Sequence, residues 1–349
     1  MPSIKIQGEY EIKKGIHYEV DGNATPIGEG GMGKVYCGQQ VDEKTGATRD
    51  VAIKFIFEDC TPVIVEKARR EASIQIHSDN LLEMLGFIET EEKTPLGETV
   101  KRYHVVSELL HGVSLSNVMK GLVIDFEGKE VAYAREMHEL YKNNPSEFAC
   151  EVVVKTLMGL IALHEAGYIH RDIDPSNIML TSDRKIKLID YGIAKRIGPT
   201  TNAEVSKTTP GMLIGKPEYA APELVLGDTY SQDFRTDIYA IGILLFECIV
   251  GHPPFKGDFA SIIHKQTEKS LPLREIKNKS LRAVIRTATQ KKREKRYQNA
   301  AEMMVALKQC SDSVKNKRTA YTLPSPFSLG IAGSIIAGLA TGVLLSLFL

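Results

Sequence analysis

The chain contains 349 residues, of which 43 % are hydrophobic and 25 % are charged, and its 44 basic residues balance its 44 acidic residues. This composition is ordinary for a globular protein and excludes a chain that is largely disordered. A net charge of zero argues against nucleic-acid binding by the whole chain, so we expect no nucleic-acid partner. At roughly 100–200 residues per domain, the length predicts about two domains or one domain with two lobes.

The N-terminal region contains a glycine-rich loop. Residues 27–36 read IGEGGMGKVY, with glycines spaced G-x-G-x-x-G and Val35 two positions after the last of them. Glycine lets backbone N–H groups approach a phosphate because no Cβ stands in the way. The β-branched and aromatic residues after the loop predict a strand–loop–strand hairpin rather than the start of a helix.

A lysine and a glutamate follow at positions that could pair. Lys54 lies in the strand-like run 51–57, where a charged side chain is costly to bury without a partner. The segment 61–77 has helical apolar spacing and begins with a predicted threonine cap, and Glu71 flanks its apolar stripe. At this point two alternatives stay open: a solvent-exposed Lys54 on an edge strand, and a surface pair between Glu71 and Lys67.

The middle of the chain brings two acids and an amide together. A predicted helix over 148–164 leads into an H-R-D sequence that ends at Asp172, and a predicted hairpin over 178–189 is followed by Asp190. Asp172, Asn177 and Asp190 therefore lie in loops around one hairpin. Carboxylate and amide oxygens suit Mg²⁺ held together with substrate phosphates, so we predict a magnesium site there.

With these motifs in place, the chain resembles the eukaryotic-type protein kinase family. The glycine loop, V-A-I-K, a helix glutamate, H-R-D-x-x-x-x-N, D-Y-G and A-P-E follow one another in the family's order. Arg296 matches the arginine that pairs with the A-P-E glutamate, Glu223. The resemblance covers roughly 18–307 and implies an α+β bilobal kinase fold, with a small β-rich N-lobe at 18–108 and a large helical C-lobe at 109–307.

The resemblance also implies a role for each matched residue. Lys54, held by Glu71, would contact the α- and β-phosphates of ATP, and Asp172 would accept the proton of the substrate hydroxyl. Asn177 and Asp190 would hold Mg²⁺. The remaining implied nucleotide contacts are Ile27, Gly28, Gly30, Gly31, Gly33, Val35 and Ala52, together with Glu108 and Leu110 in the hinge and Ser107 at the gatekeeper position.

The sequence departs from the family pattern at three positions. Tyr191 replaces the phenylalanine of D-F-G, for which we expect little cost. Asp174 stands where serine/threonine kinases carry a catalytic-loop lysine, and Lys216 stands where the opposite loop carries a threonine. Because these family positions meet near the transferred phosphate, we predict that Lys216 supplies the cation that position 174 lacks. The alternative is two unrelated changes with partial loss of activity.

The activation segment, 190–223, contains a group of hydroxyl residues. These are Thr200, Thr201, Ser206, Thr208 and Thr209. A phosphate on one of them could pair with Arg171 and order the segment, so we predict autophosphorylation there. The region 121–145 is longer than a compact kinase needs and is interpreted as a solvated helix or a docking surface.

The C-terminal residues 327–349 contain no charged side chain. As a helix these 23 residues would extend about 34 Å, enough for a bilayer core of about 30 Å. We predict a single transmembrane helix there, a linker at 308–326 and a kinase domain on the cytoplasmic side, because basic residues precede the run. Small residues recur at every fourth position, as in spans that pack together into a homodimer, but ordinary glycine usage in membrane helices is the favoured explanation. They are Gly330, Ser334, Gly338 and Gly342.

The resemblance therefore implies a membrane-anchored kinase that transfers phosphate from ATP to serine or threonine hydroxyls of proteins. The segment Tyr219–Glu223, YAAPE, resembles serine/threonine rather than tyrosine kinases. Three alternatives stay open: a nucleotide-binding pseudokinase scaffold, a tyrosine or dual-specificity kinase, and a small-molecule kinase of related fold, against which the A-P-E segment argues. The presence of every phosphate- and metal-binding residue argues against the scaffold.

Overall fold

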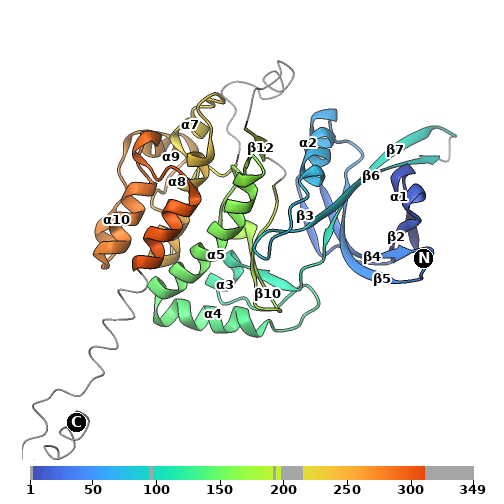
Figure 1. Ribbon diagram of the computed structural model, residues 1–349, viewed down its shortest axis with the longest axis horizontal. Helices are drawn as coiled ribbons and strands as arrows, with labels where there is room; N and C mark the ends of the chain where they lie inside the picture. Colours follow the sequence, from blue (N-terminus) through green and yellow to red (C-terminus); the bar gives the residue numbers. More distant parts are fainter. Residues whose placement is uncertain (1–2, 94–96, 192–193, 198–214, 311–349) are drawn as a thin grey trace, which may run out of the picture. The chain divides into compact units, whose positions relative to one another are not determined.

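The computed structural model describes residues 3–93, 97–191, 194–197 and 215–310, and Met1–Lys308 form one compact unit. Within this unit, a lobe rich in β-strands is followed along the chain by a lobe of helices (Figure 1). The predicted α+β bilobal fold is thereby confirmed.

The N-terminal lobe is built on one antiparallel seven-stranded sheet in the order β1-β2-β4-β5-β7-β6, with β3 paired to β4. Its strands are β1 (Ile4–Ile6), β2 (Ile16–Val20), β3 (Gly28–Gly30), β4 (Gly33–Asp42), β5 (Thr48–Ile56), β6 (Met84–Lys93) and β7 (Thr99–Glu108). β3 and β4 form the predicted glycine-loop hairpin. A Cβ on Gly33 would lie 2.0 Å from the carbonyl oxygen of Phe55, so only glycine fits there.

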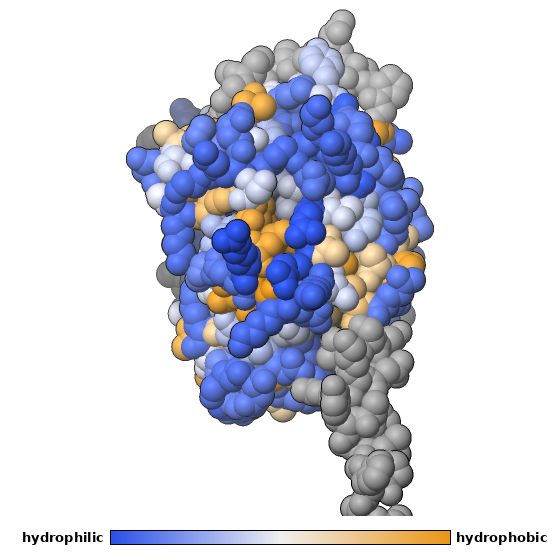
Figure 2. Space-filling model, turned by 90° about the vertical axis from the view of Figure 1, so that its left-hand side faces the viewer, coloured by the Kyte–Doolittle hydropathy of each residue, from blue (hydrophilic) through white to orange (hydrophobic). Residues whose placement is uncertain are grey.

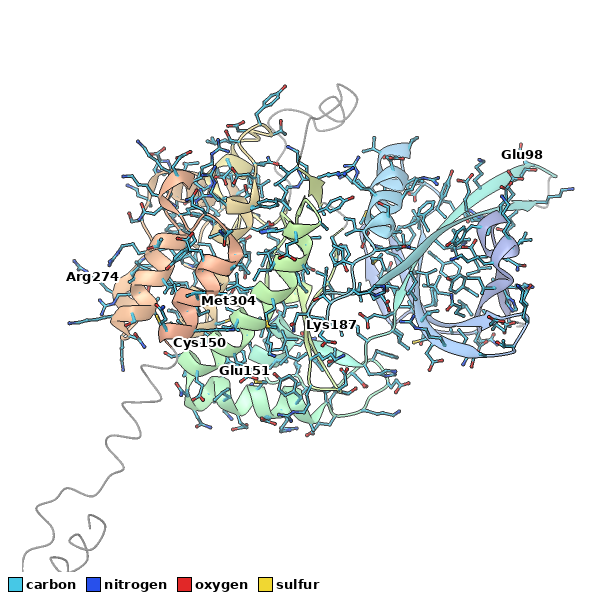
Figure 3. The ribbon with its side chains drawn as sticks, viewed as in Figure 1. Glu98, Cys150, Glu151, Lys187, Arg274 and Met304 are labelled. Atoms are coloured by element: carbon cyan, nitrogen blue, oxygen red, sulfur yellow. The ribbon has the colours of Figure 1, made fainter. Side chains whose placement is uncertain are left out.

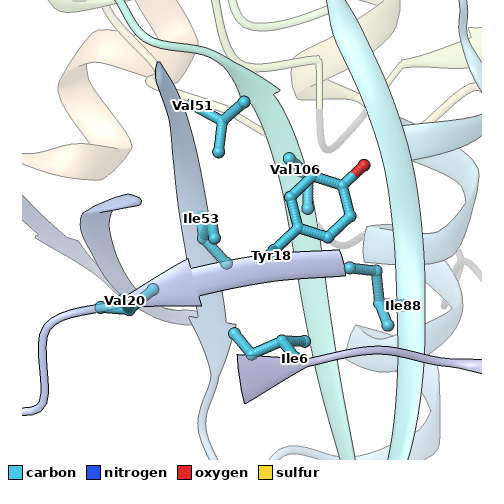
Figure 4. Close-up of a cluster of buried hydrophobic side chains, with 7 residues drawn as sticks. All are labelled: Ile6, Tyr18, Val20, Val51, Ile53, Ile88 and Val106. Atoms are coloured by element: carbon cyan, nitrogen blue, oxygen red, sulfur yellow. The ribbon is translucent and has the colours of Figure 1, made fainter. Parts of the chain in front are cut away.

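The two faces of this sheet carry different side chains. On one face a buried hydrophobic cluster joins β1 and β2 to the central strands (Figure 4). Its members are Ile6, Tyr18, Val20, Val51, Ile53, Ile88 and Val106. Because side chains alternate along a strand, Lys54 of β5 and Ser107 of β7 point to the opposite face. Alternation along β5 therefore places Val51 and Ile53 in the hydrophobic core and Lys54 on the face that lines the cavity between the lobes.

The N-terminal sheet begins at Ile4, before residue 18, where the resemblance to the kinase family begins. β1 and the helix α1 (Glu9–Lys14) precede Tyr18, and no motif predicts them. Strand β2 pairs with the end of β4, with Tyr18 opposite Gln40, so the N-terminal residues extend the sheet by two strands.

The helix that carries Glu71 is shorter than predicted. α2 spans Pro62–Ser73 instead of reaching residue 77. Thr61 is its N-cap residue, but the threonine side chain accepts no capping hydrogen bond, so that part of the prediction is wrong. Pro62 in the first turn sets the helical φ instead. Glu71 lies on the buried side of α2 with 5 % of its surface exposed, so a surface pair with Lys67 is also wrong.

The C-terminal lobe packs helices around two long apolar ones, α5 and α8, which contact each other. Its helices are α3 (Leu115–Met119), α4 (Ala132–Asn143), α5 (Pro145–Glu165), α7 (Pro222–Val225), α8 (Phe234–Val250), α9 (Phe259–Glu268) and α10 (Lys279–Ala288), and residues 300–310 are also helical. The predicted hairpin is present as β10 (Ile178–Thr181) and β11 (Ile186–Leu188). Short strands β8 (Gly112–Ser114), β9 (Tyr168–Ile169) and β12 (Lys195–Arg196) complete the lobe.

Among the described residues, no helix combines the length and the apolar character needed to cross a membrane. The predicted transmembrane helix 327–349 and most of the predicted linker 308–326 lie outside the described residues.

Candidate active site

A cavity of about 540 Å³ is lined by residues of both lobes. Its lining includes many of the predicted site residues: Ile27, Gly28, Val35, Ala52, Lys54, Glu71, Ser107, Glu108, Leu110 and Asp190. Seven other predicted residues lie outside the lining, namely Gly30, Gly31, Gly33, Asp172, Asp174, Asn177 and Lys216. The fold thus gathers residues that are far apart in the sequence around one space large enough for a small-molecule ligand.

Lys54 and Glu71 meet at the back of this cavity. The Lys54 ammonium lies 4.0 Å from Glu71 Oε2, and both side chains are largely buried. That carboxylate oxygen has no hydrogen-bond partner among the described residues. Burial raises the pKa of Glu71 to about 7; Lys54 lowers it in part, and nearby Asp190 raises it further. The contact is therefore an incompletely satisfied ion pair whose cation faces the cavity.

The hinge residues are fixed by contacts behind the cavity. The Glu108 amide donates to Glu83 O at 3.0 Å, and the Glu108 carbonyl accepts a hydrogen bond from the Ser107 hydroxyl at 3.3 Å. The Glu108 carboxylate accepts a hydrogen bond from the buried Lys187 ammonium at 2.6 Å (Figure 3 labels Lys187). Ser107 pairs with Ala52 across the sheet and both line the cavity, which agrees with the gatekeeper register.

Asp172, the acid of the catalytic loop, is held by the side-chain amide of Asn177. Asn177 Nδ2 donates to the Asp172 carbonyl at 2.8 Å and to Asp172 Oδ2 at 3.1 Å. No described residue donates to the Asn177 side-chain oxygen. Burial raises the pKa of Asp172, and the neighbouring Asp174 raises it further. A carboxylate with a raised pKa is a better proton acceptor than an ordinary aspartate.

A buried aspartate on α8, Asp237, fixes the backbone of the catalytic loop by accepting hydrogen bonds from it. Asp237 accepts hydrogen bonds of 2.8 Å from the backbone amides of His170 and Arg171 and from His164 Nε2. Burial alone would raise the pKa of Asp237, but these donors keep it below its usual range. The loop also needs Gly215 opposite it, because a Cβ there would lie 3.0 Å from Asp172 Oδ1.

The predicted metal ligand Asp190 has a left-handed backbone, with φ of 59°. The next side chain, Tyr191, is buried and packs edge-on against His170. The Tyr191 hydroxyl donates to the carbonyl oxygen of Leu82, in the segment between α2 and β6. The hydroxyl that distinguishes this residue from phenylalanine therefore ties the residue after Asp190 to the N-terminal lobe.

Asp174 and Lys216 are in contact, although 42 residues separate them in the chain. The Lys216 ammonium donates to Asp174 Oδ1 and to Ser176 Oγ, each at 2.7 Å. Asp174 is 2 % exposed, whereas the Lys216 side chain is 48 % exposed. The Asp174 carboxylate also accepts from the Ser176 amide at 2.7 Å. Asp174 and Lys216, whose charges are exchanged relative to the family pattern, thus form one ion pair beside the catalytic loop.

Arg171 is 9 % exposed, and its guanidinium donates to Gln232 Oε1 at 3.2 Å. The hydroxyl residues that we predict as phosphorylation sites, Thr200 to Thr209, lie outside the described residues.

Some site residues were not predicted. Asp125 and Phe126, from the long region 121–145, line the cavity near the hinge. No motif marks them, and only the excess length of that region hints at an added element; part of it is α4. Beyond the catalytic loop, the Tyr219 hydroxyl donates to Glu247, and both line a second cavity of about 340 Å³ next to Lys216.

The donor set fits magnesium and a polyphosphate. Asp190 offers a carboxylate and Asn177 an amide oxygen, both hard ligands of the kind that Mg²⁺ prefers. Lys54 offers a cation to an anionic ligand in the same cavity. Asp172 is a base that Asn177 orients by a hydrogen bond, and it is close enough to Asp190 for that carboxylate to raise the pKa of Asp172. A cation, an acidic metal site and a separate base together can support phosphoryl transfer.

Comparison with known proteins decides the family. A model of the protein kinase domain matches residues 23–322. The chain belongs to the eukaryotic-type protein kinase family. It is 31 % identical over 288 residues to the serine/threonine-protein kinase PknB of Mycobacterium tuberculosis, covering 80 % of this chain and 41 % of that protein. It is 30 % identical over 313 residues to the probable serine/threonine-protein kinase CE0033 of Corynebacterium efficiens, covering 86 % of this chain and 42 % of the relative.

The family membership confirms the resemblance carried by the sequence motifs. The chain spans about two fifths of the length of the curated relatives that it matches. A kinase of this family uses ATP, so the cavity that holds Lys54 and Asp190 is the candidate nucleotide site.

Proposed function

We propose that the chain is a membrane-anchored protein kinase that transfers the γ-phosphate of Mg·ATP to serine or threonine hydroxyls of proteins. The observation that carries this proposal is the convergence of Lys54, Glu71 and Asp190 on one cavity beside the Asp172–Asn177 pair. The serine/threonine preference is supported by the names of the relatives and by the YAAPE segment.

Each side chain has a task in the transfer. Lys54 balances phosphate charge and Glu71 keeps the ammonium at the cavity. Asp172, oriented by Asn177, accepts the proton of the attacking hydroxyl, and its raised pKa suits it to that task. Asn177 and Asp190 would hold Mg²⁺, which, when bound, neutralises charge on the phosphates. The glycine loop would cover the phosphates from above.

The Asp174–Lys216 pair provides the cation that the catalytic loop otherwise lacks. The carboxylate of Asp174 holds the Lys216 ammonium beside the loop, and the half-exposed lysine can reach an anionic group there. We therefore infer that Lys216 stabilises charge on the transferred phosphate, as the exchanged positions suggest.

Membrane attachment through residues 327–349 belongs to the same proposal, with 308–326 as a linker and the kinase domain in the cytoplasm. Autophosphorylation of the activation segment and span-mediated dimerisation are further parts of it. Their support is the sequence: an uncharged apolar run, small residues at every fourth position and five hydroxyls between 200 and 209.

The decisive experiment measures transfer of labelled γ-phosphate from Mg·ATP to a generic protein, followed by identification of the phosphorylated amino acid. We expect phosphoserine and phosphothreonine, and no transfer by Asp190→Ala. Glu136→Gln, which alters an exposed ion pair with Arg184, is the matched control and should retain activity. ATP binding without transfer would instead support the pseudokinase scaffold, and phosphotyrosine would overturn the serine/threonine assignment.

A further inference from the structure

One segment of the C-terminal lobe is far more basic than the rest of the chain. Residues 269–296 contain 11 lysines and arginines and 2 glutamates, a net charge of 11 − 2 = +9. The whole chain has 44 basic and 44 acidic residues, so the remaining residues carry −9. Arg293 and Arg296 of this segment are used in ion pairs with Asp233 and Glu223. Lys291 donates to the Tyr239 hydroxyl at 2.8 Å, and the other cations of the segment make no ion pair with another described residue.

Within this segment lies a cavity of about 450 Å³, separate from the active site. Four basic side chains line it, and no acidic side chain does: Arg274, Arg282, Arg286 and Lys291. Arg282 and Arg286 are four residues apart on α10, so they lie on one face of that helix. Leu271 and Leu273 add apolar surface. Arg274 is labelled at the left-hand edge of Figure 3, and this side of the molecule faces the viewer in Figure 2, where hydrophobic surface is surrounded by hydrophilic side chains.

The guanidinium groups in this cavity have no carboxylate partner among the described residues. Arg282 donates only to the backbone carbonyl of Lys277, at 3.3 Å, and Arg274 and Arg286 make no ion pair. Elsewhere on the surface, arginines do pair with acids, as Arg184 does with Glu136. Bringing like charges together without a counter-ion costs free energy, and a bound anion would remove that cost. Burial, with a smaller contribution from Arg296, lowers the pKa of Lys291 to about 8.

The geometry points to a phosphate-bearing ligand, and we propose that this cavity binds the headgroup of an anionic phospholipid. Guanidinium groups match phosphate oxygens with paired hydrogen bonds, and a basic pocket with an apolar wall suits a lipid headgroup. Exposed Lys277 and Lys279 extend the positive charge beyond the cavity, over a surface that suits a bilayer better than a single peptide.

The lipid assignment rests on the proposed membrane anchor. Residue 310 is the last described residue, and 16 residues separate it from the apolar run at 327. At about 3.5 Å per residue, a fully extended connection is at most about 56 Å long, so an anchor that begins at 327 would keep residue 310 within that distance of the bilayer.

The test uses the full chain in a neutral detergent and measures binding of short-chain phosphatidylglycerol, with short-chain phosphatidylcholine as the neutral probe. We expect phosphatidylglycerol alone to bind, and Arg274→Gln/Arg286→Gln to weaken it about 30-fold. The matched control is Lys277→Gln/Lys279→Gln, which removes the same charge outside the cavity and should change binding less than about threefold. Kinase activity on a soluble peptide should be unchanged in both variants, which verifies that they fold.

Three outcomes would overturn the proposal. Equal weakening by both double variants would indicate a diffuse field rather than a site. Equal binding of phosphatidylglycerol and phosphatidylcholine would show that the negative charge of the headgroup does not contribute to binding. Binding of inorganic phosphate or a phosphopeptide as tightly as phosphatidylglycerol would assign the cavity to another ligand. Flotation of the full chain with vesicles of pure phosphatidylcholine tests the anchor separately: if flotation fails while phosphatidylglycerol still binds, the anchor is wrong and the lipid site stands.

Discussion

Two buried ion pairs in this molecule differ in how completely their charges are satisfied. In the C-terminal lobe, Arg296 directs all five of its N–H donors to oxygen acceptors. The Glu223 carboxylate takes two of them, at 2.7 and 2.9 Å, and backbone carbonyls take the others. In the active site, Lys54 and Glu71 share one contact of 4.0 Å. The first pair is complete in the folded chain, whereas the second leaves its cation available to a ligand.

This contrast separates a structural pair from a functional one. A buried charge is costly unless hydrogen bonds satisfy it, and the Glu223–Arg296 pair meets that requirement without any ligand. Glu71 meets the requirement differently, because its raised pKa of about 7 lets it bind a proton when its partner is lost. The motif pattern identifies both pairs, but only the structure distinguishes them.

The largest expected effect comes from breaking the complete pair. Glu223→Gln leaves the guanidinium of Arg296 buried without a counter-charge, and we expect the free energy of unfolding to fall by about 3–5 kcal/mol. Lys54→Met should change it by less than about 1 kcal/mol near pH 7, because Glu71 can take up a proton. Denaturant unfolding of both variants measures this. Similar losses in the two variants would contradict the distinction.

The second prediction concerns pH. Because the folded-state pKa of Glu71 is raised from 4.5 to about 7, the folded chain binds more protons than the unfolded chain between these values. The contribution of Glu71 is therefore fully favourable below pH 4.5 and is lost as pH rises through 7, by up to about 3 kcal/mol. The difference in unfolding free energy between wild type and Glu71→Gln, measured from pH 4.5 to 8, should fall by that amount. A difference that is flat with pH would show that Glu71 titrates normally.

Much of the site was predictable because motif residues occupy fixed places on local elements. Lys54 on a strand, Glu71 on a helix and Asp190 after a hairpin follow from spacing and periodicity, which local physics sets. The end of α2 at Ser73 was not predictable in this way. The extra strand β1 was missed because the alternation of apolar and polar residues in it extends over only three residues, too few to distinguish a strand.

Contacts between segments that are far apart in the sequence were harder to predict. The sequence indicated that Asp174 and Lys216 exchange charge, but the 2.7 Å contact depends on how two loops pack. The cavity lining from Asp125 depends on the path of a long connection, and the hydrogen bond from the Tyr191 hydroxyl to Leu82 depends on lobe packing.

The third prediction concerns the exchanged charges. Asp174→Lys places two cations together and Lys216→Asp places two acids together, so each should lower kcat by about 30-fold. The double variant Asp174→Lys/Lys216→Asp restores the pair and should recover most of the loss, a coupling of about 3–4 kcal/mol. Exchange of the exposed pair Glu130 and Arg135 is the control and should leave kcat unchanged. Additive losses in the double variant would favour two unrelated changes.

The smallest expected effect is that of Tyr191→Phe, which removes the hydroxyl that donates to the Leu82 carbonyl. Loss of one buried hydrogen bond should lower the free energy of unfolding by about 1 kcal/mol. Because Tyr191 follows Asp190 directly, we also expect a higher Mg²⁺ concentration for half-maximal activity. Tyr18→Phe is the matched control, since its hydroxyl accepts a hydrogen bond from Gln40 far from the site. It should lose similar stability without changing the Mg²⁺ dependence, and an equal Mg²⁺ shift in both variants would rule out a positioning role for Tyr191.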